Sequence, residues 1–131
     1  MEDRKQYEEL ISELISKVLI GCDDLRIKPW KGSPFALSGH CYIAAEAAYH
    51  LLGGRYSKHL KPCFIRHEGE PHWYIQSRHG IIDPSAEQFE SPVPYHKGKG
   101  KGFLSKGPSK RAQALISRVQ VYYSHHVSPA L

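Results

Sequence analysis

The chain has 131 residues, of which 40% are hydrophobic and 11% are aromatic. This length and composition predict one globular domain over residues 1–131 and exclude a disordered or fibrous chain. No apolar run approaches the roughly 20 residues that a membrane-spanning helix needs, and the opening MEDRKQYEEL lacks the apolar stretch of a signal peptide. We therefore expect no membrane association and a cytoplasmic location.

The net charge of +5 is distributed unevenly along the chain. All thirteen acidic residues lie within residues 2–90, together with eleven of the eighteen lysines and arginines. Residues 91–131 contain the other seven lysines and arginines and no acid. A basic segment of this kind indicates either an anionic partner or a solvated surface, and composition leaves both interpretations open.

Two helices are predicted in the first half of the chain. Apolar residues recur at helical spacing over residues 4–20, and Gly21 ends that helix. After an irregular segment over residues 21–38, Ser38 is a candidate N-cap for a helix over about residues 39–52. Four alanines in this second helix allow neighbouring elements to pack closely against it, so we expect it to be central and buried.

Three short strands and a last helix are predicted in the second half. The strands, which alternate in polarity, cover residues 61–67, 72–77 and 81–83. Residues 84–107 contain prolines and a lysine–glycine alternation, which is typical of a long loop. Pro108 or Ser109 then begins the last helix. Helices at both ends and strands in the middle predict an α+β domain, in which the second helix packs on a small antiparallel sheet.

The three cysteines are Cys22, Cys41 and Cys63. Their odd number and the absence of a CxxC pair predict free thiols. Catalysis by a thiol needs the thiolate, which a helix N-terminus and a neighbouring imidazolium both stabilise. Cys41 falls in the first turn of the second predicted helix, where backbone N–H groups would also bind an oxyanion. It is therefore the candidate nucleophile, and a buried structural cysteine is the alternative interpretation.

A base and a carboxylate that orients it are predicted on neighbouring strands. His72 begins one strand and Asp83 ends the next, and an even number of residues between them permits direct cross-strand pairing on one face. Three residues from each strand and a four-residue loop over residues 76–79 would set His72 opposite Asp83. The same alternation puts Tyr74 on the face of His72 and Trp73 on the other face.

The order of a cysteine at a helix start, a histidine on a strand and an aspartate on the next strand resembles that of papain-like enzymes. These include transglutaminase-like enzymes, NlpC/P60 amidases and arylamine N-acetyltransferases. The resemblance rests on GHCYIAAEAAYHLLGG, PHWYI and IIDPSAEQF, within about residues 38–90. It implies a papain-like α+β core in which Cys41 is the nucleophile, His72 the general base and then acid, and Asp83 the group that orients the imidazole.

The activity that this resemblance implies is that of a cysteine-dependent hydrolase or acyltransferase with a thioester intermediate and no cofactor. A protein or a small amide or thioester is the implied substrate. Papain-like proteases carry a glutamine about six residues before the cysteine to help bind the oxyanion, and this chain has Phe35 there. The oxyanion would then be bound by backbone N–H groups or by His40, Gln88 or Tyr74. Trp73 is either a core residue or a platform for the substrate.

The chain also resembles small proteins of tailed bacteriophages, in which the HC[YF]-x-A segment, the HW pair and a GFL-x(3)-PSKRA ending recur. This resemblance implies a location in the host cytoplasm and names no substrate. A phage-type structural or inhibitory protein that lacks catalysis is therefore one alternative function. The oligomeric state is left open.

The basic loop over residues 97–111 is a second candidate binding site. Its glycines and lysines suit an anionic or nucleotide-bearing ligand, although their spacing is not that of a P-loop. The anion-binding candidates are Lys106, Ser109, Lys110 and Arg111. A nucleic-acid-binding module that uses residues 97–118 is the other alternative function. Nine histidines are present, but none form an HxxxH or HExxH pair, and we expect no metal.

Overall fold

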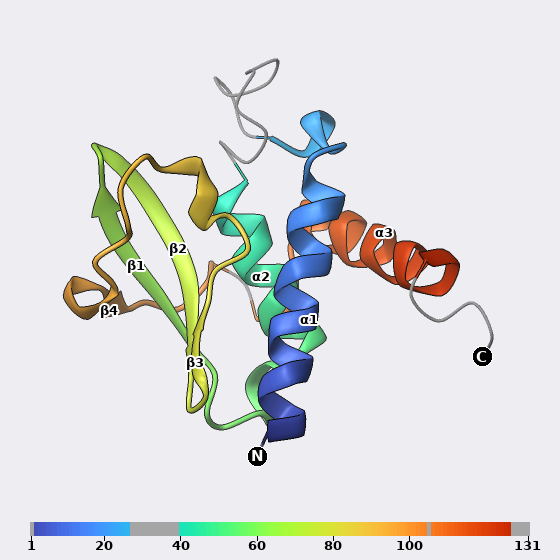
Figure 1. Ribbon diagram of the computed structural model, residues 1–131, viewed down its shortest axis with the longest axis horizontal. Coiled ribbons are helices and arrows are strands. Elements are labelled where there is room, and N and C mark those ends of the chain that lie inside the picture. Colours follow the sequence, from blue (N-terminus) through green and yellow to red (C-terminus); the bar gives the residue numbers. More distant parts are fainter. Residues whose placement is uncertain (1, 27–39, 105, 127–131) are drawn as a thin grey trace.

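The computed structural model describes residues 2–26, 40–104 and 106–126. Within them, three α-helices and a four-stranded antiparallel sheet form a mixed α+β fold, as the sequence predicts (Figure 1). The helices are α1 (Glu2–Leu19), α2 (Cys41–Leu51) and α3 (Lys110–His126). The strands are β1 (Lys61–His67), β2 (Glu70–Ser77), β3 (Gly80–Ile82) and β4 (Lys99–Gly100), and their order in the sheet is β3-β2-β1-β4.

The α2 helix lies at the centre of the fold. It packs against β2, α1 and α3 (Figure 1). Its four alanines are fully buried, and their small side chains let these neighbours approach the helix closely. The prediction of a central, buried helix is therefore confirmed. The helix begins at Cys41 with His40 as its N-cap, and the predicted cap Ser38 lies outside the described residues.

The hairpin between β2 and β3 is tighter than predicted. Ser77 pairs with Gly80, so only two residues form the loop, and Gly80 has a left-handed φ of +135° that glycine adopts without strain. The predicted four-residue loop and the direct pairing of His72 with Asp83 are therefore wrong. Continuing the observed register places Asp83 opposite Tyr74. Because the change in register is even, the side chains of His72 and Asp83 still share one face.

Both faces of the sheet are covered. The face that carries Ile75 and Ile82 packs against α1 and α2, and α3 packs on these two helices to complete the main core. The opposite face is covered by the long connection between β3 and β4. A second apolar cluster forms there, and it contains Cys63, Ile65, Tyr74 and Val93, with Phe89 and Tyr95 packed against it. The His72 ring contacts Phe89 and Tyr74, so the histidine lies at the border of this second cluster.

The β4 strand lies inside the segment that the sequence predicts to be a loop. It pairs with β1 through Cys63 with Gly100 and Phe64 with Lys99. The lysine–glycine alternation carries no apolar residue, so hydrophobic periodicity gives no sign of a strand. The α3 helix runs to His126. Near its C-terminal end, Val121 and Tyr123 are exposed, whereas Tyr122 packs against the main core.

Candidate active site

His72 and Asp83 form a buried pair. The two residues are joined by a hydrogen bond of 2.6 Å between Nε2 of His72 and Oδ2 of Asp83, and their side chains are 0% and 3% exposed. Tyr95 donates its hydroxyl to the same Oδ2 at 2.7 Å, and Tyr74 donates to the backbone carbonyl of Tyr95 at 3.1 Å. The carboxylate is thus fixed by two donors, and it orients the imidazole through Nε2.

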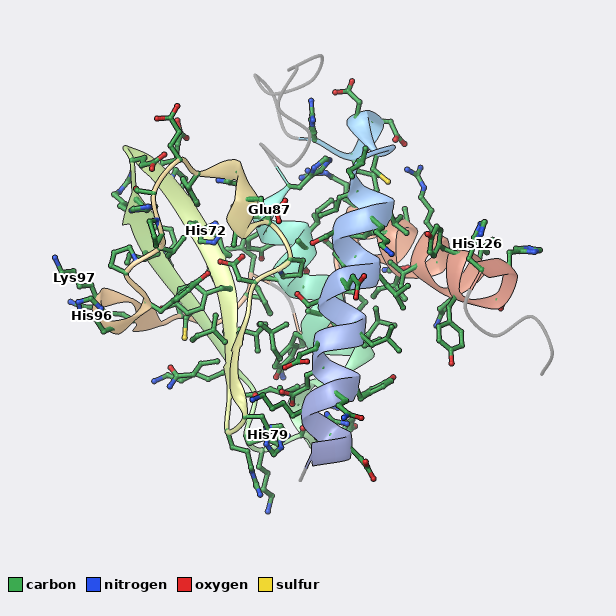
Figure 2. All side chains as sticks on the ribbon, viewed as in Figure 1. His72, His79, Glu87, His96, Lys97 and His126 are labelled. Carbon is green, nitrogen blue, oxygen red and sulfur yellow. The ribbon has the colours of Figure 1, made fainter. Side chains whose placement is uncertain are left out.

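Cys41 reaches this pair from the N-terminus of α2. It is the first residue of the helix and is partly exposed, and its Sγ contacts the carbonyl of Pro71 at 3.5 Å, immediately before His72. In Figure 2, His72 projects from β2 on the side where α2 begins. The other two cysteines, Cys22 and Cys63, are each only 2% exposed. Of the three free thiols, Cys41 is therefore the one that a substrate can reach.

The protonation of His72 responds to both neighbours. Burial lowers its pKa, but the hydrogen bond to Asp83, the interaction with Cys41 and the charges on both groups outweigh that effect and raise the pKa to about 9. Nε2 is committed to Asp83, and Nδ1 has no hydrogen-bond partner among the described residues. Nδ1 is consequently the ring nitrogen that is left for the sulfur of Cys41. An imidazolium at this position favours a thiolate beside it.

Other polar atoms close to the pair are also without partners. Asp83 Oδ1, Ser85 Oγ and Gln88 Oε1 are buried and make no hydrogen bond within the described part of the chain. Buried polar groups in proteins nearly always have a partner in the protein or in bound water. All three groups lie on the segment that follows β3.

The backbone at the start of α2 supplies free donors. The first hydrogen bond of the helix runs from the N–H of Ala44 to the carbonyl of His40 at 2.9 Å. The N–H groups of Cys41, Tyr42 and Ile43 precede that bond and have no partner within the helix. They point along the helix axis toward its N-terminus, where the dipole favours negative charge. An oxyanion that develops on a carbonyl attacked by Cys41 would be stabilised there.

The predicted oxyanion residues lie in different surroundings. His40 is buried, its Nε2 is hydrogen-bonded to the carbonyl of Cys22 at 3.0 Å, and burial lowers its pKa. The hydroxyl of Tyr74 is engaged with Tyr95, and burial is the main cause that raises the Tyr74 pKa to about 12. Gln88 is partly buried, and its Oε1 is buried without a hydrogen-bond partner among the described residues. An amide oxygen accepts hydrogen bonds, so this atom could not stabilise an oxyanion.

Trp73 is placed in an aromatic cluster. It is partly buried and meets Tyr42 edge-on, with ring centroids 5.0 Å apart, and it stacks on Phe103 at 5.6 Å. It packs against the main core. These contacts support its interpretation as a core residue rather than as an open platform for the substrate.

The predicted anion-binding residues do not converge. The backbone N–H and hydroxyl of Ser109 bind the carboxylate of Glu46 at 3.0 and 2.7 Å, and Glu46 is fully buried on α2. Arg111 donates from Nε and Nη2 to the carbonyl of Leu25. The N-terminus of α3 is therefore capped from within the fold, and it fastens α3 to the helix that carries Cys41. Only Lys106 and Lys110 are exposed.

Sequence reasoning missed two groups of the site. Tyr95, which holds Asp83, lies in the long connection, where no periodicity marks a residue as structural or functional. The second is the backbone carbonyl of Pro71, which contacts Cys41. A pattern of side chains in the sequence cannot predict the contact of a backbone group. The only sequence signal for Tyr95 is an aromatic residue between Pro94 and Gly98 in a segment that is otherwise polar.

Comparison of the chain with protein-family models, with curated proteins and with solved structures found no match. In the described ranges, no three histidine, cysteine, aspartate or glutamate side chains gather as a metal site would require. Among the same residues, none of the helices combines the length and apolarity needed to cross a bilayer.

Proposed function

We propose that this chain is a cysteine-dependent hydrolase or acyltransferase with Cys41 as its nucleophile, His72 as its acid and base, and Asp83 as the orienting carboxylate. The observation that carries the proposal is the buried His72–Asp83 pair whose second ring nitrogen is left for a partly exposed cysteine at a helix N-terminus. We also propose a papain-like core. It is supported by the packing of a central helix that begins with cysteine against the sheet strand that carries the histidine.

Acylation would begin with His72 protonated and Cys41 as thiolate. The sulfur attacks the carbonyl carbon of an amide or thioester, and the carbonyl π electrons move to the oxygen, which the N–H groups of α2 stabilise. His72 then gives its proton to the leaving amine or thiol as the bond to that group breaks. A thioester on Cys41 and a neutral His72 remain, and Asp83 holds the ring in place throughout.

Deacylation would reverse these roles. Neutral His72 takes a proton from water or from an acceptor amine, whose oxygen or nitrogen attacks the thioester carbonyl. The sulfur leaves as thiolate, and the product is a carboxylic acid or a transferred amide. His72 is protonated again, so the starting state is restored without a cofactor or an external oxidant.

Mapping the sites of alkylation tests the nucleophile. Folded protein treated with iodoacetamide near pH 6 is expected to be modified at Cys41 at least about tenfold faster than the same residue in the urea-unfolded chain, because only the fold supplies the imidazolium and the helix N-terminus. Cys22 and Cys63 are buried and serve as internal controls that react only on unfolding. A rate at Cys41 that does not exceed the unfolded rate would reject the proposal, since exposure alone would then explain the reaction.

The raised pKa of His72 predicts a pH dependence. With a pKa of about 9 the ring is protonated at neutral pH and loses its proton as the pH rises through about 9. Turnover should therefore fall through this range, because the leaving group loses its acid. We expect imidazole nitrogen signals in NMR spectra to titrate near pH 9 for His72, and Cys41→Ser to lower that midpoint. His40, whose pKa burial lowers, is the internal reference. A His72 midpoint at or below the ordinary value of about 6.5 would contradict the assignment.

A further inference from the structure

The lysine–glycine alternation places lysines on one side of the sheet edge. A Cβ atom at Gly98 would overlap the phenol of Tyr74, so only glycine lets the chain lie this close to the second apolar cluster. A Cβ atom at Gly100 would meet the side chain of Lys61. Because successive residues of an extended chain point to opposite sides, Lys99 between the two glycines faces away from that cluster, and Lys101 lies over the ring of Phe64 on the same side. We call Arg66, Lys97, Lys99 and Lys101 the basic edge.

The cations of the basic edge have no acidic partner. None of them makes an ion pair with any residue that the structure describes, although ion pairs form at both ends of α1, in the turn after it and on α3. They line or adjoin a groove of about 540 Å³ beside β1. The groove also contains His67 and Glu68, which are hydrogen-bonded to Ser91 and Glu90. Glu68, the one acidic residue that lines this groove, is thus held by hydrogen bonds to Glu90 and Ser91. Figure 2 shows Lys97 projecting from the sheet edge that lies farthest from the helices.

The aromatic rings beside these cations are covered. Nζ of Lys101 lies 4.6 Å from the ring centroid of Phe64 and 5.6 Å from that of Trp73. The indole also packs against Phe103 and Tyr42. Proteins that bind single-stranded nucleic acids typically combine a basic groove with open aromatic faces on which the bases stack. The basic edge offers ammonium groups without such faces, and this favours carboxylates as the ligand.

We propose that the basic edge binds an acidic peptide segment, rich in glutamate or aspartate, of a protein partner. Lys99 lies in β4 at the edge of the sheet, Lys97 lies just before that strand and Lys101 follows it, so the three ammonium groups are offered close together at this edge. Trp73, whose ring centroid lies 5.6 Å from Nζ of Lys101, also contacts Tyr42, the residue after Cys41 in the chain. The inference concerns binding alone and does not require Cys41 to be catalytic.

Fluorescence anisotropy of the full chain carrying Cys41→Ser tests this binding apart from any turnover. The probe is a fluorescein-labelled peptide of alternating glutamate and serine. We expect Lys99→Glu/Lys101→Glu to weaken its binding by about tenfold or more. The matched control is Lys58→Glu/Arg78→Glu, which makes the same change in net charge at exposed positions away from the edge and should alter the affinity by less than about twofold.

Further measurements decide the ligand class. Binding of the acidic peptide should weaken with added salt, and a glutamine–serine peptide should not bind. Lys99→Gln/Lys101→Gln, which only removes charge, should give an intermediate loss, and circular dichroism should show that the variants keep the fold. Equal losses in the basic-edge and control variants, or tighter binding of a thymidine oligonucleotide than of the acidic peptide, would overturn the proposal.

Discussion

Replacing His72 with alanine is expected to lower the rate of iodoacetamide alkylation at Cys41 by about 10- to 100-fold near pH 6. An ordinary cysteine near pH 6 is only about 0.3% thiolate. The proposed mechanism requires a protonated ring beside Cys41, and the pKa of His72, raised to about 9, supplies one near pH 6. The loss is smaller than the change in thiolate fraction alone, since a more basic thiolate is also a stronger nucleophile.

The matched control for this variant is His67→Ala. Both rings lie 4.8 Å from the ring of Phe89, so the two substitutions open comparable gaps beside the second apolar cluster. His67 is hydrogen-bonded to Ser91, and no hydrogen bond joins its ring to Cys41 in the described part of the chain. We expect His67→Ala to leave the alkylation rate of Cys41 within about twofold of the native rate. Equal reductions in both variants would show that packing, rather than the imidazolium, controls the thiol.

The positions of the three candidate site residues could be predicted from local patterns, because Cys41 and His72 lie on short, regular elements and Asp83 directly follows β3. A cysteine in the first turn of an alanine-rich helix and a histidine on an alternating strand need no tertiary information to be placed. Parity alone puts Asp83 on the face of His72, and this held although the turn is two residues shorter than predicted. A register error of two residues leaves each side chain on the same face of the sheet. An error of one residue would have put His72 and Asp83 on opposite faces.

The remaining features depend on contacts between distant segments. The Glu46 carboxylate caps the N-terminus of α3 and is 63 residues away from Ser109 in the sequence. The sequence around Ser109 predicts the start of a helix but gives no sign of this partner. Gly98 lies against Tyr74, so the lysine–glycine alternation is a strand edge rather than a loop. Local sequence propensity predicts neither contact, because in each one the partner residue belongs to a distant element of the fold.

Asp83→Ala is expected to destabilise the native state by about 3 to 5 kcal/mol, which is the usual cost of removing one partner from a buried ion pair. His72 and Tyr95 both depend on Oδ2 of this carboxylate, and the His72 ring is fully buried. Alanine leaves the imidazole of His72 and the hydroxyl of Tyr95 without their shared acceptor. The free energy of unfolding in urea measures the loss, which is a large share of the roughly 5–15 kcal/mol that holds a domain together.

Tyr95→Phe separates the two contributions to that loss. It removes one donor and leaves the His72–Asp83 pair intact, so we expect a cost of only about 1 kcal/mol. In a double-mutant cycle, His72→Ala and Asp83→Ala together should cost well below the sum of the single variants, because each single change strands the other's charge. Additive effects, or a loss below about 1 kcal/mol for Asp83→Ala, would mean that the carboxylate is solvated and does not hold the ring. The fixed position of the His72 ring would then lack a cause, because the hydrogen bond to Asp83 is what orients it.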